Sequence, residues 1–142
     1  TGWTGVDAGV QTWLSTNTLP PLGAGLRTFV IYGPTGSLAQ SVTVPLACTT
    51  GGHAYALGFV YSAAFDATAL RAEVEFLDGA NASLQTDSVV LASTPNPNPP
   101  PGFVTATGSL TGSVPGGAAS ATVRFLATDW DAVVDKVTLT FC

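Results

Sequence analysis

The sequence predicts an all-β protein: a single antiparallel β-sandwich of about eight strands, with at most one short N-terminal helix. Short runs of β-branched and aromatic residues recur along the 142 residues, separated by turns rich in glycine, proline and asparagine. Helical periodicity is nearly absent. Short, regularly spaced strands with such turns are typical of sandwiches and barrels. We therefore expect one domain, residues 1–142, which is long enough for a substantial core.

The strongest helical pattern lies in an N-terminal segment that spans residues 1–24. Within residues 6–14, Asp7 is placed to cap a helix, and one face would hold Val6, Val10, Trp13 and Leu14. Gly9 weakens this pattern because glycine disfavours a helix interior. We therefore expect a short helix or a turn here, and nothing longer.

Eight later runs have the composition of strands, and they span residues 27–32, 40–46, 53–62, 71–77, 88–92, 103–109, 121–127 and 136–142. In five of these runs apolar residues alternate with others, which predicts one buried and one exposed face; in the run 40–46, Val42 and Val44 share one face. The residues expected to point inward are Tyr55, Leu57, Phe59 and Tyr61; Ala72, Val74 and Phe76; Ala121, Val123 and Phe125; and Val137, Leu139 and Phe141.

One low-complexity stretch, residues 93–102, contains five prolines. Prolines at this density favour polyproline II and prevent regular strand pairing. Only about 40 residues follow, near the lower limit for an independent domain. We interpret the stretch as a stiff loop inside one domain, available for function or for assembly contacts.

Charge is scarce in this chain. Charged residues make up 9% of the sequence, against about 25% in ordinary soluble domains. Such a composition suits extracellular proteins and subunits of larger assemblies. The net charge is −5 and the four basic residues are scattered singly, which argues against nucleic-acid binding and a polybasic membrane patch. No apolar run approaches the roughly 20 residues of a membrane span.

The two cysteines, Cys48 and Cys142, each lie at or just beyond the end of a predicted strand. A disulfide between them would close a long loop and stabilise the fold by about 4 kcal/mol through chain entropy. Two buried free thiols fit the sequence equally well, so both interpretations stay open. A structural zinc site is not expected from two cysteines and one distant histidine.

Catalytic patterns are weak, and we expect no enzyme. Glu73 and Glu75 share a strand face with Arg71, as on an outer face with charge pairing. His53 is the single histidine, and no nucleophile motif accompanies it. Such a motif would place serine or cysteine beside a base and an acid.

The order of several short motifs resembles the galactose-binding-like jelly rolls, which include many carbohydrate-binding modules. The residues that carry the resemblance are Gln40-Ser41-Val42-Thr43-Val44, Tyr55-Ala56-Leu57, Val114-Pro115-Gly116-Gly117-Ala118 and Asp135-Lys136-Val137-Thr138-Leu139. It covers roughly residues 25 to 142 and implies a jelly-roll sandwich. Such domains occur in glycosidases, adhesins and phage tail or capsid accessory proteins, so the fold leaves the function open.

The resemblance also implies a structural calcium ion near Asp135, because an aspartate before the last strand is a calcium ligand in that family. The N-terminal acidic ligand of the family has no clear counterpart, since only Asp7 is available. The alternative is that Asp135 accepts hydrogen bonds from backbone amides.

Exposed aromatic residues are the remaining candidates for ligand or interface contacts: Trp3, Trp13 and Trp130, the last flanked by Asp129 and Asp131. Tryptophan stacks on sugar rings and is equally enriched at protein interfaces. We expect a non-catalytic structural or decorating subunit of an extracellular assembly, foremost a phage virion. Its partners would be other subunits, as a homo-oligomer such as a trimer or on a capsid or tail surface. The alternative is a carbohydrate-binding module of a secreted bacterial protein, with glycans as partners.

Overall fold

The computed structural model describes residues 3–6, 8–12, 27–31, 35–62, 70–92, 94, 106–127 and 132–142. Within them lie ten strands and one short 3₁₀ turn, η1 (Leu46–Cys48). The strands are β1 (Trp3–Val6), β2 (Ala8–Thr12), β3 (Arg27–Ile31), β4 (Ser37–Thr43), β5 (Ala54–Ser62), β6 (Leu70–Leu77), β7 (Ser83–Leu91), β8 (Ala106–Ser113), β9 (Ser120–Ala127) and β10 (Ala132–Phe141).

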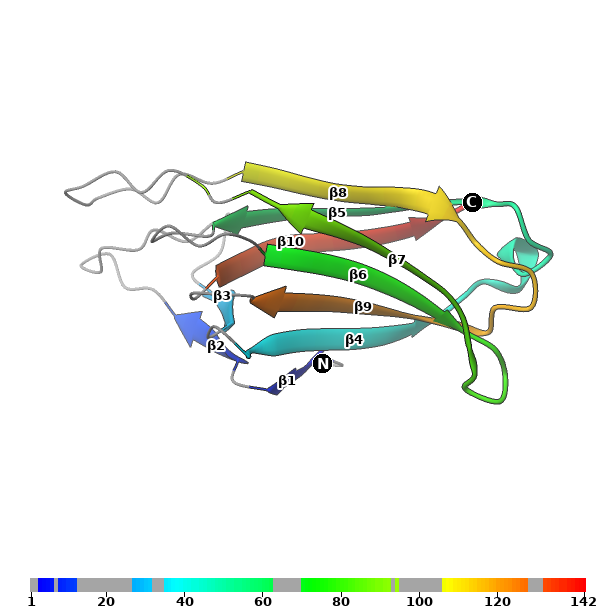
Figure 1. The fold of residues 1–142 in the computed structure, drawn as a ribbon, viewed down its shortest axis with the longest axis horizontal. Helices are drawn as coiled ribbons and strands as arrows, with labels where there is room; N and C mark the ends of the chain where they lie inside the picture. Colours follow the sequence, from blue (N-terminus) through cyan, green and yellow to red (C-terminus); the bar gives the residue numbers. More distant parts are fainter. Residues whose placement is uncertain are drawn as a thin grey trace.

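The strands form two antiparallel five-stranded sheets that pack face to face (Figure 1). Sheet 1 has the order β1-β4-β9-β6-β7, and sheet 2 has the order β2-β3-β10-β5-β8. Each sheet takes strands from both halves of the chain. This confirms the antiparallel β-sandwich that the sequence predicts. The described residues contain no helix long and apolar enough to span a membrane.

The predicted inward residues of the central strands form the core between the sheets. Tyr55, Leu57 and Phe59 of β5 are at most 3% exposed. They meet Phe76 and Phe125 of sheet 1, with ring centroids 5.2 Å apart for Tyr55–Phe76 and 4.9 Å for Phe59–Phe125. Edge-to-face packing of this kind adds to the stabilisation from apolar burial. Strand alternation was therefore a sufficient guide to the core in these strands.

The N-terminal expectation was wrong for residues 8–12, which form strand β2 rather than a helix or turn. β1 pairs with β4 and β2 pairs with β3, so each adds an outer strand to a different sheet. Gly5 and Gly9 disfavour a helix, and pairing satisfies the backbone groups of both segments. Of the other residues of the expected helix, residue 6 belongs to β1 and residues 7, 13 and 14 lie outside the described residues, as does most of the expected proline loop 93–102.

A β-bulge in β10 decides which residues of that strand face the core. Before the bulge, Ala132 and Val134 are buried. The pairing with β5 shifts between Asp135 and Thr138, and Lys136 has a φ of 51°. The extra residue reverses the alternation, so that Val137, Leu139 and Phe141 are partly buried against the core. Without the bulge, Lys136 would point inward.

A disulfide joins Cys48 of η1 to Cys142, which follows β10. It links the loop after β4 of sheet 1 to the last strand of sheet 2. Nearby, Cys142 donates its backbone N–H to the carbonyl of Ala54, so the chain end is also held against β5. The disulfide favours an extracellular location, because disulfides persist in oxidising environments.

Candidate functional site

Four of the five residues that the sequence singled out for ligand or interface contacts lie outside the described part of the chain. These are Trp13, Asp129, Trp130 and Asp131. Their expected role in ligand or interface contacts therefore stays a prediction. Trp3 is described: its ring lies against Phe125 of β9, with centroids 6.1 Å apart.

Asp135 lies inside β10, at the bulge. Its Oδ1 accepts a hydrogen bond from the backbone N–H of Lys136 at 2.7 Å. Among the described residues, no three His, Cys, Asp or Glu side chains gather as a metal site would need. The calcium site therefore stays a prediction, and Asp7, the N-terminal acid considered for it, is not among the described residues.

A small cleft opens between the sheets beside Trp3. It has a volume of about 210 Å³ and is lined by Trp3, Gln40, Val42, Val123, Val137, Leu139 and Phe141. The three β10 residues line it because the bulge turns them inward. The amide of Gln40 is the only polar side-chain group apart from the indole, so the cleft is mainly apolar.

On the outer face of sheet 2, small residues of β5 lie between hydroxyl residues of its two neighbouring strands, next to a depression at one end; we call this surface the β5 groove. Its floor is β5, and its walls are the neighbouring strands β8 and β10, which lie on either side of β5 (Figure 1). The strand register places a small floor residue between two hydroxyl-bearing residues in two successive rows: Thr111–Ala56–Thr140 and Ser109–Gly58–Thr138. The wall hydroxyls therefore stand on both sides of a low floor.

One part of the β5 groove, next to Cys142, forms a depression. It has a volume of about 570 Å³ and is lined by Ala54, Tyr55, Ala56, Thr111, Gly112, Ser113, Thr140, Phe141 and Cys142. Ala54 and Ala56 are exposed there, while Tyr55 and Leu57 on the other face of β5 are buried. Strand alternation thus gives one strand both a core face and a solvent face.

The two walls of the β5 groove differ in their hydrogen bonding. On β10, the hydroxyls of Thr138 and Thr140 donate to the carbonyls of Gly58 and Ala56, each at 3.3 Å. These bonds hold the two hydroxyl groups against the β5 backbone. On β8, the exposed side chains of Thr107, Ser109, Thr111 and Ser113 form a line of hydroxyls, each both a donor and an acceptor.

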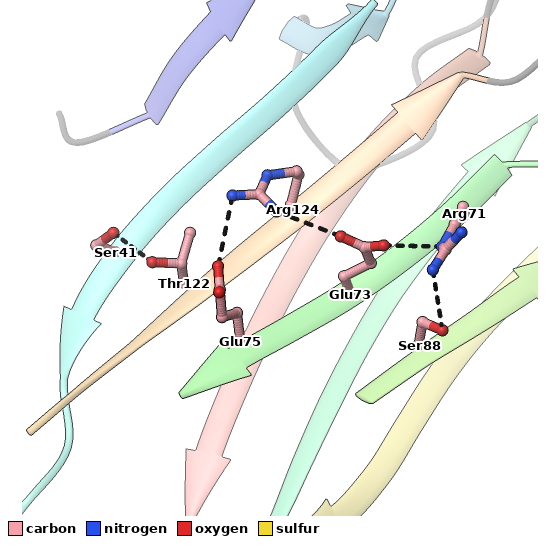
Figure 2. A network of polar contacts seen from close by, with 7 residues as sticks. All are labelled: Ser41, Arg71, Glu73, Glu75, Ser88, Thr122 and Arg124. Atoms are coloured by element: carbon pink, nitrogen blue, oxygen red, sulfur yellow. Dashed lines mark hydrogen bonds and ion pairs between the residues drawn. The ribbon is translucent and has the colours of Figure 1, made fainter. Parts of the chain in front are cut away.

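Charged side chains lie on the opposite face of the sandwich. On the outer face of sheet 1, Arg124 contacts Glu73 at 3.3 Å and Glu75 at 3.7 Å (Figure 2). Arg71 contacts Glu73 at 2.8 Å. The network continues to Ser88 at one end, and Ser41 and Thr122 share a hydrogen bond nearby. The predicted outward placement of Glu73 and Glu75 is confirmed, and both acids are neutralised by arginine.

The electrostatics of the two outer faces therefore differ. No Asp, Glu, Lys or Arg side chain lines the depression in the β5 groove. Asp135 and Lys136 come further along β10, beyond the rows of hydroxyls. The depression thus offers hydroxyl groups and apolar side chains to a ligand, without a charged side chain.

Sequence reasoning missed the β5 groove. The outward hydroxyls of β8 lie in residues 106–113, and the expected strand at 103–109 was placed several residues too early. The alternation of hydroxyl residues in this run was the available signal. The groove itself needs three strands from different parts of the chain to lie side by side.

Comparisons with known proteins identify the fold. No family model matches the sequence, and no curated protein is significantly similar to it. Among solved structures, the enzymatically active domain of bacteriophage CBA120 tailspike protein 4 is similar at 20% identity and a TM-score of 0.65. The match covers 99% of this chain and 19% of the tailspike chain, so the chain spans about a fifth of that protein.

Two carbohydrate-binding modules match over most of their own length. The family 61 module TmCBM61, solved in complex with β-1,4-galactotriose, is 15% identical with a TM-score of 0.58, covering 97% of this chain and 87% of that one. The CBM22-1 xylan-binding domain of Paenibacillus barcinonensis Xyn10C is 14% identical with a TM-score of 0.57, covering 99% and 85%. The chain therefore has the jelly-roll β-sandwich fold shared by these modules and the tailspike domain, as its motifs implied.

Proposed function

We propose that this chain is a non-catalytic module that binds a neutral glycan along the β5 groove, as part of a secreted or virion-surface protein. The observation that carries the proposal is the pair of rows in which Ala56 or Gly58 lies between hydroxyl residues of β8 and β10.

The dimensions of the β5 groove suit an extended sugar chain. Its walls stand two strand spacings apart, about 9–10 Å. A sugar ring has apolar C–H faces and hydroxyls around its edge. The ring can lie flat on the Ala and Gly floor while its edge hydroxyls bond to the walls. Because Ser and Thr hydroxyls both donate and accept, they match either role of a sugar hydroxyl.

The lack of charged side chains around the depression favours a neutral ligand. A sulfated or uronic acid polymer would need basic partners, and the depression has none. A neutral polymer avoids the cost of placing a charge against unpaired groups. The similar modules support this choice, since one was solved with a galactotriose and the other is described as xylan-binding.

A non-catalytic role is supported by the state of the described acids. Glycoside hydrolysis uses two carboxyl groups that face one cleft. Glu73 and Glu75 form ion pairs with arginines on the outer face of sheet 1, away from the β5 groove. Their positions favour a structural role in that sheet.

The proposal predicts that filling the floor of the groove abolishes binding. Ala56→Leu places a branched side chain where the sugar ring would lie, and we expect at least about a tenfold loss of affinity, or 1.4 kcal/mol. Affinity electrophoresis and calorimetry with soluble β-1,4-galactan and xylan measure the loss. Thr43→Leu, exposed on the outer face of sheet 1, is the matched control and should bind like the wild type.

Two results would contradict the proposal. Retention of full affinity by Ala56→Leu would remove the ligand from the β5 groove. If Trp130→Ala then abolished binding, the site would lie in the loop that the sequence singled out. If the wild type bound no neutral glycan at all, the function itself would be excluded.

A second candidate function is a structural subunit of a phage virion. The similarity to a tailspike domain and the low proportion of charged residues favour it. Antibodies against the chain should then label purified particles of the source virus in electron microscopy. Particles without label would exclude a virion subunit and leave the glycan proposal intact.

A further inference from the structure

The depression in the β5 groove lies beside the disulfide. The two rows of floor and wall residues are followed by a third, in which Ala54 of β5 pairs with Ser113 of β8. On the β10 side of this row lies Cys142, whose backbone N–H donates to the carbonyl of Ala54 at 2.8 Å. All three residues line the depression. Cys142 is therefore part of the wall of the proposed glycan site.

The end of β10 that carries Cys142 is held by few neighbours. Among the described residues, β3 pairs with β10 only at residues 132–134. In that part of the chain, residues 138–141 of β10 therefore pair with β5 alone. Phe141 is only partly buried against the core. A segment with one paired side and partial burial opens locally at little cost, and the single further hydrogen bond at Cys142 adds little net stability.

The other half of the disulfide lies at a well-packed point of the fold. Cys48 is 1% exposed, and backbone hydrogen bonds close the η1 turn around it. The residue that follows η1, Thr49, accepts a hydrogen bond at 3.0 Å from the backbone N–H of Gly117, in the loop before β9. The bridge thus connects a firmly held segment to a weakly paired one. Loss of the bridge would release the end of β10 rather than η1.

We propose that the Cys48–Cys142 disulfide holds the wall of the β5 groove in place, so that the groove binds its glycan tightly only in the oxidised chain. The inference rests on the proposed glycan binding and adds a redox condition to it. A dithiol such as dithiothreitol transfers two electrons and two protons to the bridge, which gives two thiols and the cyclic disulfide of the reductant. Cys142 is then free to leave Ala54, and the depression loses that part of its wall.

Glycan affinity with and without dithiothreitol tests this dependence. Calorimetry with β-1,4-galactotriose and affinity electrophoresis with soluble xylan should show at least a tenfold rise in the dissociation constant on reduction. Circular dichroism identifies conditions in which the reduced protein is folded. Leu70→Ala is the control for lost stability, because Leu70 is fully buried in β6 of sheet 1. Its cavity destabilises the fold but leaves the disulfide intact, so this variant should bind like the wild type.

An insertion separates the position of Cys142 from the cross-link itself. Two glycines placed between Phe141 and Cys142 leave the bridge able to form, so the unfolded chain stays restricted. They remove the register that places Cys142 beside Ala54. We expect this variant to stay folded and oxidised, as thiol alkylation and mass spectrometry would show. Its dissociation constant should nevertheless rise at least tenfold.

The hold of the disulfide on β10 can also be measured without a ligand. NMR order parameters of backbone amides are about 0.85 in rigid segments and below 0.6 in flexible ones. In the oxidised protein the Cys142 amide should have the rigid value. On reduction it should fall to the flexible value, while the amide of Phe125 in β9 stays rigid.

Several results would overturn the inference and leave glycan binding intact. These are equal affinity of the folded oxidised and reduced protein, full affinity of the insertion variant, an equal loss in Leu70→Ala, and a Cys142 amide that stays rigid after reduction. Should reduction unfold the protein, the insertion variant decides the question. If the oxidised wild type bound no neutral glycan, the proposed function would fail and this inference with it.

Discussion

At the scale of single residues, Tyr55 shows how one side chain serves both sheets. Its ring is buried on the inner face of β5, and its hydroxyl donates to Oδ2 of Asp87 on β7 at 2.7 Å. Gln85 donates to the same oxygen. The Tyr55 hydroxyl, at the edge of the core, is thereby paired. Leaving it without a hydrogen bond would cost about 1–3 kcal/mol.

Tyr55 makes the stability of the protein sensitive to alkaline pH. Burial raises the pKa of Tyr55 well above its usual range, and the hydrogen bond and negative charge of Asp87 raise it further. The folded state therefore keeps this proton at a pH where the unfolded chain loses it. The contribution to stability is complete below about pH 10 and declines as pH rises above that value.

We predict that the stability difference between the wild type and Tyr55→Phe shrinks above pH 10. Below that pH the variant should be less stable by about 1 kcal/mol, the usual value of one hydrogen bond. Urea unfolding at a series of pH values measures both. Tyr61→Phe is a useful comparison, because burial also raises the pKa of Tyr61. A difference that stays constant from pH 8 to pH 11 would contradict the role given to Tyr55.

At the scale of elements, glycines in β8 make room for the aromatic rings of β5. Gly108 lies opposite Phe59 and Gly112 lies opposite Tyr55 in the pairing of these strands. A Cβ on Gly108 would overlap the ring of Phe59, and one on Gly112 would lie 2.8 Å from Tyr55. The rings thus cover the β8 backbone, which compensates for glycine's lack of a side chain to pack.

We predict that Gly108→Ala destabilises the protein by about 1–3 kcal/mol, because the Phe59 ring must leave its position in the core. Gly79→Ala is the matched control: a Cβ there meets nothing within 4 Å, so the change should stay within about 0.5 kcal/mol. Guanidinium unfolding midpoints compare the two variants. Equal midpoints would mean that the ring does not rest on Gly108.

The elements also show where sequence patterns suffice. Alternation predicted the buried faces of β5, β6 and β9, because each of these central strands has one face against the core along its length. Alternation did not identify β2. This short strand contains Gly9, and it forms by pairing with β3, which lies further along the chain. In β10 the sequence predicted that Val137 faces the core. It did not predict the bulge, which allows both Val134 and Val137 to face the core.

At the scale of the whole molecule, the disulfide connects the two sheets at the end of the sandwich that carries η1. Cys48 and Cys142 are 94 residues apart in sequence. A cross-link across so long a loop restricts the unfolded chain strongly. It also holds the C-terminus next to Ala54, at the end of the β5 groove.

We predict that reduction of the disulfide lowers the free energy of unfolding by about 4 kcal/mol. Guanidinium unfolding of the wild type with and without dithiothreitol measures the effect. The double variant Cys48→Ser/Cys142→Ser should have the same free energy of unfolding as the reduced wild type, and dithiothreitol should not change it. Identical midpoints for oxidised and reduced wild type would contradict this prediction.

The sequence by itself determined the fold class, the core faces of the central strands and the outward position of Glu73 and Glu75. These properties follow from local alternation, which is a property of each strand alone. The tertiary structure decided between a disulfide and free thiols for Cys48 and Cys142, and it created the β5 groove. Both depend on strands from distant parts of the chain lying in register, which no local pattern encodes.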